Sequence, residues 1–425
     1  MSVILPNVRA AFAPIAHAAL WPVRVGLRAY ARAEPRAADR VGAERRVTIV
    51  LGSAWGMGGT IRTVHNLAGH LASRGYEVEI LSVFRSRGKP FFAFAPGVRV
   101  TALDDRRARA RLRRLPSALA HPANAGPRWN LWVDVQLVRR LRRRTGFLIT
   151  TRPVLNLIAA DLRLPGLVRV GQEHMSHDVW GPRLRRAMVA AYPRLDVLVT
   201  LTEGDRTRYA QAMGGGVRIE RIPNSVSALG GPEPDLAAPL LLAAGRLTSQ
   251  KGFDRLIDAF ADVAADHPAW RLRICGRGDL REPLQRQIDG AGLTHRIELA
   301  GAVTDMGAAM AQASIFVLSS RSEGFPLILL EAMSKGLAPV AFDCRTGPAD
   351  IIDDRRNGRL VPDGDVDALA AAMGELMADA DLRRGYAAAA RQTAAGYDMA
   401  EAIGPRWEAL LAELYAHAKA NGRNL

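Results

Sequence analysis

Apolar runs of strand length alternate with helical patterns from residue 47 onward. In the first half of the chain the strand patterns lie at residues 47–52, 78–83, 168–170 and 197–201. A glycine turn at residues 56–59 and a helical pattern at 60–73 complete the first βαβ unit. Such alternation is typical of a parallel sheet covered by helices. We therefore expect a Rossmann-like domain over residues 47–226.

The second half repeats this alternation after a turn-rich linker at residues 227–239. Its strand patterns lie at residues 240–244, 270–275, 297–299, 315–319, 338–342 and 358–361. Its helical patterns lie at residues 253–265 and 280–291 and from residue 365 onward. We expect a second Rossmann-like domain at residues 240–400 and a helix within 401–425, centred on 407–418, that packs back on the first domain. The expected fold class is α/β, with two doubly wound domains that face a cleft.

Length and charge refine this picture. A chain of 425 residues exceeds the size at which one hydrophobic core stops growing, which favours two domains. The net charge of +16 is uneven, because residues 1–230 hold 37 Lys and Arg against 15 Asp and Glu, whereas residues 231–425 hold 21 against 27. A basic half of this kind favours an anionic partner, either a membrane or a nucleic acid, although a solvated arginine-rich surface has the same composition.

An extension at residues 1–46 carries part of the positive charge. Its arginines are spaced by four, at Arg24, Arg28, Arg32, Arg36 and Arg40. A single helix would place them on one stripe, which we expect either to lie on an anionic membrane surface or to have no membrane role. The apolar stretch at residues 11–23 is shorter than the roughly 20 residues of a spanning helix, so no transmembrane helix is expected.

Cysteine and histidine usage indicates neither disulfides nor a metal site. Cys275 and Cys344 have neither the spacing of a disulfide framework nor that of zinc ligands, which favours a cytoplasmic location. If the extension at residues 1–46 binds a membrane, we expect the protein at the inner face of the cell membrane. Residues 173–178 lack the His-Glu-x-x-His order of a zinc site. Asp363 and Asp365 fit turn and helix-cap roles, so no metal is expected.

Two loops carry residues suited to phosphate groups. Gly56, Gly58 and Gly59 lie between a strand and a helix, where the backbone approaches a ligand closely and a helix N-terminus favours anions, although no Walker or dinucleotide motif is present. Arg246 and Lys251 lie in the corresponding strand-to-helix loop of the second domain. Their cationic groups are suited to neutralising a leaving diphosphate, the alternative being two exposed cations without a ligand.

A third loop contains two carboxylates eight residues apart, Glu323 and Glu331. Pro326 fits the first turn of the following helix, which leaves the N–H groups of Leu327 and Ile328 free to meet a phosphate. We expect Glu323 to bind sugar hydroxyls and Glu331 to bind ribose hydroxyls.

These residues resemble the retaining family 4 glycosyltransferases of the GT-B fold, whose Glu-x7-Glu motif matches Glu323 and Glu331. In the second domain the resemblance extends over Arg246, Lys251 and residues 276–278, 301–303, 346–358 and 360–362, which is essentially all of residues 240–365. In the first domain it is looser and rests on Gly58, Gly59, Arg62, Glu173, His174 and residues 223–225.

The resemblance implies catalytic roles for Glu323, His174, Arg246 and Lys251. It implies that Arg246 and Lys251 hold the diphosphate and that His174 lies near the reacting sugar. The implied donor-binding residues are Gly58, Gly59, Arg62, Gly276, Arg277, Val303, Gly324, Phe325, Pro326, Leu327, Ile328 and Glu331. It also implies a metal-independent retaining transfer in which the leaving phosphate takes the acceptor proton. No cofactor is implied beyond the substrate, a UDP- or GDP-linked sugar.

The function expected is transfer of a hexose or aminohexose to a glycan or a lipid-linked, anionic acceptor in cell-envelope polysaccharide or glycolipid synthesis. An epimerase or phosphorylase on the same fold is one alternative. Another is a protein without transferase activity that binds nucleic acid or an anionic membrane, as its isoelectric point near 10.8 allows. Aromatic residues make up only 6% and no nucleic-acid-reading motif is present, so we expect no nucleic-acid partner.

Overall fold

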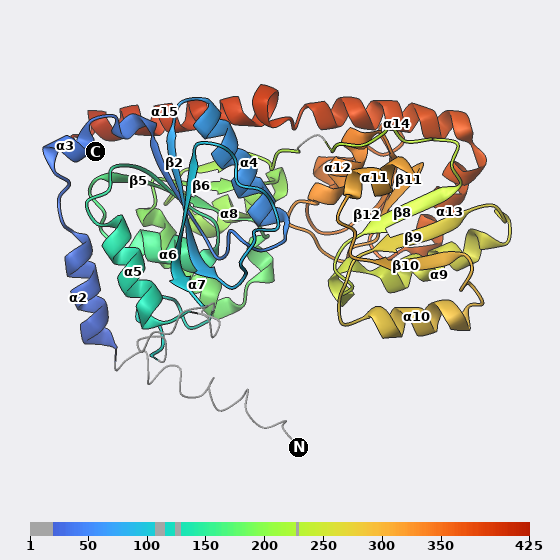
Figure 1. The fold of residues 1–425 in the computed structure, drawn as a ribbon, viewed down its shortest axis with the longest axis horizontal. Helices are drawn as coiled ribbons and strands as arrows, with labels where there is room; N and C mark the ends of the chain where they lie inside the picture. The colour runs from blue at the N-terminus through green and yellow to red at the C-terminus, as the bar shows by residue number, and fades with distance from the viewer. Residues whose placement is uncertain (1–19, 107–114, 124–128, 227–228) are drawn as a thin grey trace, which may run out of the picture. The chain divides into compact units, whose positions relative to one another are not determined.

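The computed structural model describes residues 20–106, 115–123, 129–226 and 229–425 (Figure 1). Residues 1–19 of the predicted extension and the first two residues of the predicted linker lie outside the described residues. The chain forms two compact units. Unit 1 comprises residues up to Thr200, Asp205–Ile222 and Gly404–Leu425, and unit 2 comprises Leu201–Gly204 and Pro223–Ile403.

Unit 1 is built on a seven-stranded parallel sheet of order β3-β2-β1-β4-β5-β6-β7. Its strands are β1 Arg46–Leu51, β2 Glu77–Arg85, β3 Val98–Asp105, β4 Gly146–Thr150, β5 Leu167–Gln172, β6 Val197–Thr200 and β7 Ile219–Arg221. The helices of this half are α2 Trp21–Ala31, α3 Ala37–Arg40, α4 Gly59–Ser73, α5 Leu131–Leu141, α6 Pro153–Asp161, α7 Pro182–Ala191, α8 Glu203–Met213 and α15 Gly404–Ala420. Strands β3, β4 and β7 are additional to the predicted ones.

Unit 2 is built on a six-stranded parallel sheet of order β10-β9-β8-β11-β12-β13. Its strands are β8 Leu240–Ala244, β9 Arg271–Cys275, β10 Ile297–Gly301, β11 Ile315–Leu318, β12 Ala338–Asp343 and β13 Arg359–Pro362. Its helices are α9 Phe253–Ala264, α10 Arg281–Gly290, α11 Met306–Ala311, α12 Leu327–Lys335, α13 Val366–Ala378 and α14 Ala380–Ala395. All six strands lie within two residues of the predicted ones.

The central strands are buried along nearly their whole length, which explains why they are continuous apolar runs. Strands β4, β6 and β11 have only buried residues, as expected of parallel strands whose sheet is covered on both faces. In each sheet the strand order reverses at one point, between β1 and β4 in unit 1 and between β8 and β11 in unit 2. Ligands of doubly wound sheets bind beyond the carboxyl ends of the strands at such a point.

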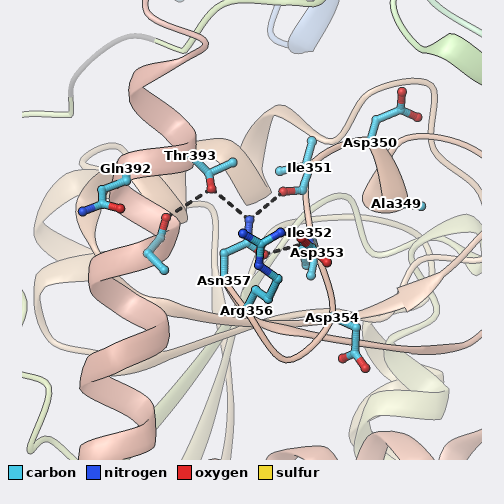
Figure 2. Close-up of a pocket in the computed structure, with 11 residues that line it drawn as sticks. Ala349, Asp350, Ile351, Ile352, Asp353, Asp354, Arg356, Asn357, Gln392 and Thr393 are labelled. Atoms are coloured by element: carbon cyan, nitrogen blue, oxygen red, sulfur yellow. Dashed lines mark hydrogen bonds and ion pairs between the residues drawn. The ribbon is translucent and has the colours of Figure 1, made fainter.

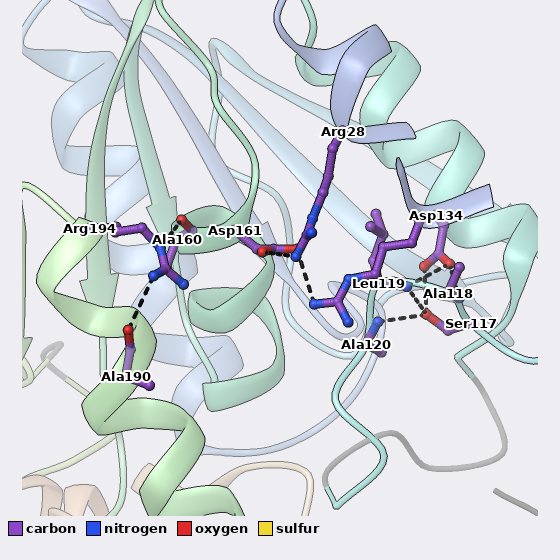
Figure 3. Close-up of polar contacts among 11 residues, drawn as sticks. Arg28, Ser117, Ala118, Leu119, Ala120, Asp134, Ala160, Asp161, Ala190 and Arg194 are labelled. Carbon is purple, nitrogen blue, oxygen red and sulfur yellow. Dashed lines mark hydrogen bonds and ion pairs between the residues drawn. The ribbon is translucent and has the colours of Figure 1, made fainter. Parts of the chain in front are cut away.

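The predicted single stripe of five arginines is wrong. Helix α2 ends at Ala31 and the short helix α3 begins only at Ala37, because Pro35 disfavours helical backbone at the residue before it. The first two arginines face the body of unit 1. Arg28 Nε donates to Asp161 Oδ2 at 2.8 Å (Figure 3), and Arg24 Nη2 donates to the same oxygen at 3.2 Å. The face of α2 that remains exposed carries Trp21 instead, with 64% of its surface accessible.

Helix α15 packs against α4 and β5 within unit 1. Two polar contacts accompany this packing: Glu408 Oε1 lies 2.9 Å from His70 Nε2, and Glu413 Oε1 forms an ion pair with Arg218 Nη1 at 2.6 Å. Among the helices of the described residues, none combines the length and the apolar character needed to cross a membrane.

Candidate active site

Three loops at the carboxyl edge of the unit 2 sheet pack backbone against backbone. A Cβ on Gly276 would lie 1.7 Å from the Gly245 carbonyl oxygen, and one on Gly278 would lie 2.2 Å from the Leu247 carbonyl oxygen. The Gly276 N–H also donates to the Gly301 carbonyl at 2.7 Å. Glycine at these positions is therefore required for the loops after β8, β9 and β10 to meet.

The loop after β8 also lies against the end of β11. Gly252 has φ +61°, and a Cβ there would lie 2.1 Å from the Ser319 carbonyl oxygen. Ser319 Oγ donates to the Lys251 carbonyl at 3.0 Å. This approach brings Lys251 Nζ to 2.6 Å from Glu323 Oε1. Both side chains of this ion pair are largely buried, with 16% and 8% of their surface exposed.

Glu323 is held by two further side chains of unit 2. Ser320 Oγ donates to Glu323 Oε1 at 2.6 Å, and Thr346 Oγ1 donates to the Glu323 carbonyl oxygen. Glu323 Oε2 accepts no hydrogen bond from the described residues, so this oxygen is available to a hydroxyl group of a ligand. Ser320 has no counterpart in the sequence prediction, because a serine three residues before a glutamate carries no specific signal.

Two cations of the predicted donor set have no partner within the described part of unit 2. Arg246 follows β8 and Arg277 follows β9, and both side chains are exposed. Thr248 lies in the same loop as Arg246 and Lys251, and its Oγ1 is a buried atom that also lacks a hydrogen bond in the described chain. The edge of the sheet therefore presents two unneutralised guanidinium groups and a buried polar atom, which suit an anionic ligand.

The start of α12 differs from the prediction in one respect. The helix begins at Leu327, one residue after Pro326, and the Leu327 N–H donates to the Phe325 carbonyl at 2.9 Å. The expectation that this N–H is free is wrong, because the chain makes a tight turn at the proline. The N–H of Ile328 has no acceptor within the described residues. Glu331 is buried one turn further along α12.

The other predicted donor residues of unit 2 shape this edge through packing. Phe325 is buried and its ring lies 5.8 Å from that of Tyr397. Val303 is half-buried against an apolar cluster behind the edge. Gly324 lies in the loop between β11 and α12, and its carbonyl oxygen would be 3.6 Å from a Cβ on Gly347.

In unit 1, His174 follows the carboxyl end of β5. Burial lowers the pKa of this imidazole to about 3, and the nearby charge of Arg152 acts in the same direction. His174 is therefore neutral at physiological pH. Its Nε2 is a buried atom without a hydrogen-bond partner in the described residues.

Glu173, the residue before this histidine, is completely enclosed. Burial raises the pKa of its carboxyl group to about 8, although hydrogen bonds from Tyr192 and Asn156 oppose the shift. The Tyr192 hydroxyl donates to Glu173 Oε1, and Asn156 Nδ2 donates to the same oxygen at 2.7 Å. Neither residue was predicted, because Asn156 lies in α6 and Tyr192 lies just after α7, and only the fold brings them together.

The glycine loop of unit 1 lies at the carboxyl end of β1. Helix α4 begins at Gly59, and the N–H groups of Ile61 and Arg62 both donate to the Gly58 carbonyl at 3.1 Å. A Cβ on Gly58 would meet no atom within 4 Å, so the space beside this residue is open. The Arg62 guanidinium lies over the ring of Phe92, 5.7 Å from its centre.

A separate concavity of about 520 Å³ lies in unit 2 between the 349–357 loop and α14 (Figure 2). Asn357 spans it, because its Nδ2 donates to the Ile351 carbonyl at 3.0 Å and to Thr393 Oγ1 at 2.9 Å. The residues that line this concavity include none of the predicted donor residues, all of which are described.

The arrangement of two parallel-sheet α/β units has counterparts among solved structures. The Staphylococcus aureus protein TarM, crystallised as a mutant with Fondaparinux, alpha-GlcNAc-glycerol and UDP, superposes with a TM-score of 0.72 at 15% identity, over 86% of this chain and 99% of that chain. The fold is GT-B, which confirms the predicted pair of Rossmann-like domains.

Family comparisons then define the class of enzyme. Residues 57–228 match the model "Glycosyltransferase Family 4", and residues 232–393 match "Glycosyl transferases group 1". Both halves of the chain thus match glycosyltransferase families, which supports the predicted GT-B glycosyltransferase of the family 4 type. Retention of configuration stays a prediction.

Several relatives match most of this chain. An exopolysaccharide phosphotransferase of Streptomyces coelicolor is 36% identical over 397 residues, which is 87% of this chain and 41% of that protein. The amylovoran biosynthesis glycosyltransferase AmsD of Erwinia amylovora is 26% identical over 381 residues, which is 86% of this chain and 99% of that protein. This chain thus spans about two fifths of the Streptomyces protein and nearly all of the Erwinia protein.

Proposed function

We propose that this chain transfers a hexose or aminohexose, with retention of configuration, from a UDP- or GDP-linked sugar to a glycan or lipid-linked acceptor in cell-envelope polysaccharide or glycolipid synthesis. The observation that carries the proposal is the edge of the unit 2 sheet. There Glu323 lies beside Lys251 with one carboxylate oxygen free of hydrogen bonds, and the adjoining loops carry the guanidinium groups of Arg246 and Arg277, neither of which has a partner among the residues that the structure describes. The name of the Erwinia relative and the UDP bound to TarM support this choice.

The donor diphosphate would be neutralised by protein cations. Arg246 and Arg277 offer planar forks that match phosphate oxygens, and Lys251 offers a compact charge. The free N–H of Ile328 would add a donor at the start of α12. Because three cations meet the charge that grows on the leaving diphosphate, we propose that the transfer needs no metal ion.

The sugar and the ribose would be held by carboxylates. Glu323 Oε2 would accept a hydrogen bond from a hydroxyl of the donor sugar, and Glu331 would bind the ribose. The acceptor hydroxyl would attack from the face that the diphosphate leaves, and its proton would pass to the departing phosphate oxygen. His174, neutral because of its lowered pKa, would hydrogen-bond a sugar hydroxyl through Nε2.

Nucleotide binding tests the donor site. We would titrate UDP, GDP, ADP and CDP into the protein by calorimetry and compare Arg246→Ala with Arg286→Ala, an exposed arginine on α10 that serves as a charge-matched control. We expect one nucleotide to bind preferentially and its Kd to rise about 10-fold in Arg246→Ala only, as for loss of one charge-assisted hydrogen bond. A folded protein that binds none of the four, or equal affinity in the Arg246 variant, would contradict the donor assignment.

Lys251 is less suitable for this test. Its removal would leave the Glu323 carboxylate buried without its cation, which destabilises a protein irrespective of nucleotide binding. Arg246 is exposed and unpartnered among the described residues, so its substitution reports on the ligand alone.

Product stereochemistry tests retention and metal independence. Proton NMR would identify the anomer of the free sugar that is first released when the enzyme transfers the sugar of the preferred donor to water. The measurement would be made with and without EDTA. Retention predicts the α anomer from an α-linked donor, at the same rate in both samples. The β anomer would contradict the retaining mechanism, and inhibition by EDTA would contradict metal independence.

Peripheral association with an anionic membrane, at the cytoplasmic face, is part of this proposal. Its support is α2, which exposes Trp21, Val25 and Tyr30 with 64%, 41% and 46% of their surface accessible. Apolar and aromatic side chains on a helix in a basic domain are typical of interfacial binding. The buried free thiols of Cys275 and Cys344 fit the reducing compartment on that side.

A further inference from the structure

The amino-terminal edge of the unit 1 sheet contains a basic concavity of about 400 Å³. It is formed where β1, β2 and β4 begin, at the opposite end of the sheet from Gly58 and His174. Six arginines line it: Arg46, Arg99, Arg140, Arg142, Arg143 and Arg144. Three acidic residues line it as well, so the concavity has an excess of positive charge.

The acidic residues are already engaged by only some of these arginines. Glu77 pairs with Arg46 at 3.1 Å and lies 3.7 Å from Arg99. Glu79 pairs with Arg144, whose Nε also donates to the Arg140 carbonyl at 2.9 Å.

The carboxylate of the third acid, Asp39, accepts a hydrogen bond from the backbone N–H of Arg36 at 3.2 Å. The guanidinium group of Arg46 binds the backbone carbonyl of Asp39 and not its carboxylate. The side chains of Arg140, Arg142 and Arg143 therefore face the concavity without an acidic partner among the described residues.

Arg142 and Arg143 are held in place at an energetic cost. The Arg142 guanidinium stacks on the Tyr30 ring at 3.7 Å, while its Nε is buried without a hydrogen-bond partner in the described residues. Arg143 has φ +62°, a left-handed conformation that costs a residue other than glycine about 1 kcal/mol and that asparagine adopts more readily. An arginine kept at such a position, next to an unsatisfied buried guanidinium nitrogen, suggests a ligand that uses both.

We propose that this concavity is a second anion site, which binds the phosphate groups of a ligand other than the sugar donor. Arg140 and Arg143 would supply mobile cations, and Arg142 a guanidinium preorganised by Tyr30, to a group with several phosphate oxygens. Because the site lies at the amino edge of the sheet, it does not depend on the donor assignment at the carboxyl edges.

The test is calorimetric titration of inorganic tripolyphosphate at low salt. The double variant Arg140→Gln/Arg143→Asn removes two positive charges. Glutamine is compatible with the last turn of α5, and asparagine is compatible with the left-handed backbone at position 143. Arg183→Gln/Arg186→Gln, on the exposed face of α7, removes the same charge from the same unit. We expect the Kd to rise about 10-fold or more in the first variant and to stay within about 2-fold in the second.

The melting temperature and a second variant keep the test specific. The double variant is expected to melt at or above the temperature of the unmodified protein, because Arg143→Asn relieves strain. Arg246→Ala should leave this binding event unchanged. An unchanged Kd in the double variant, equal losses in the two arginine pairs, loss in Arg246→Ala alone, or no binding of tripolyphosphate would each overturn the proposal.

Vesicles distinguish the source of the phosphate. The same variants would be sedimented with phosphatidylcholine vesicles that contain phosphatidylglycerol. Loss of vesicle binding in the double variant, together with loss of tripolyphosphate binding, identifies a lipid headgroup as the ligand. Unchanged vesicle binding with lost tripolyphosphate binding identifies a free phosphorylated ligand.

Discussion

Replacing Glu173 with glutamine should make the protein increasingly more stable than the unmodified protein as pH rises. Burial raises the pKa of this carboxyl group from 4.5 to about 8 in the folded protein. Between these two values the folded state holds a proton that the unfolded chain has lost, so stability falls by about 1.4 kcal/mol for each pH unit. This contribution to stability is complete below pH 4.5 and is lost as pH rises towards 8. The glutamine side chain does not titrate in this range, so the variant lacks this pH-dependent loss of stability.

The magnitude follows from the two pKa values. From pH 5 to pH 8 the penalty of Glu173 grows by about 3.5 kcal/mol, after allowing for half-ionisation of the folded group at pH 8. In a unit of this size about 1 kcal/mol shifts the melting temperature by 2–4 °C. The melting temperature of Glu173→Gln minus that of the unmodified protein should therefore rise by about 10 °C over this range.

Differential scanning fluorimetry at pH 5, 6, 7 and 8 measures this difference directly. Glu220→Gln is the matched control, because Glu220 is a half-exposed glutamate on β7 of the same unit. A difference that stays constant from pH 5 to pH 8 would refute the reasoning, since it would mean that Glu173 is ionised in the folded protein.

Three further predictions concern the donor edge and α2. Glu323→Gln should lower turnover at least about 100-fold, as for loss of a transition-state hydrogen bond, and should also lower the melting temperature, because the largely buried Lys251 loses its carboxylate partner; activity within 2-fold of normal in a transfer assay would contradict its role. Lys251→Met should destabilise unit 2 by about 3 kcal/mol because Glu323 stays buried and charged, which urea unfolding would measure; an unchanged midpoint would show that the pair is solvated. Trp21→Ser/Val25→Ser should reduce sedimentation with phosphatidylglycerol vesicles several-fold, and equal sedimentation would remove α2 from the membrane proposal.

The alternation of strands and helices was readable from the sequence because parallel strands buried on both faces are continuous apolar runs. The strand β11 is one example, with four buried residues followed by the polar loop that holds Glu323. By contrast β7 is three half-buried residues long, and its pattern Ile-Glu-Arg does not differ from that of a loop. Its existence depends on pairing with β6, which no local pattern reveals.

The candidate site was predictable to the extent that it is local. Arg246, Lys251 and Glu323 each lie just after a strand, and the reversal of strand order between β8 and β11 places these loops side by side. The supports of Glu323 were not predictable, because Thr346 reaches it from the loop after β12. The prediction of a single arginine stripe failed for the same reason. Asp161, which binds Arg24 and Arg28 and turns them inward, lies 133 residues beyond Arg28 in the sequence.

The Lys251–Glu323 pair links the stability of unit 2 to its proposed chemistry. The pair keeps a carboxylate buried at the sheet edge in one orientation, with Ser320 bonded to the same oxygen. A neutral pair, Lys251→Met/Glu323→Gln, leaves no buried charge, so it should recover most of the stability lost in Lys251→Met alone. Its turnover should nevertheless be no higher than that of Glu323→Gln, because Lys251 is also part of the proposed donor site. Recovery of stability without activity would show that folding needs only a balanced pair, whereas transfer needs the charged groups of Lys251 and Glu323 themselves.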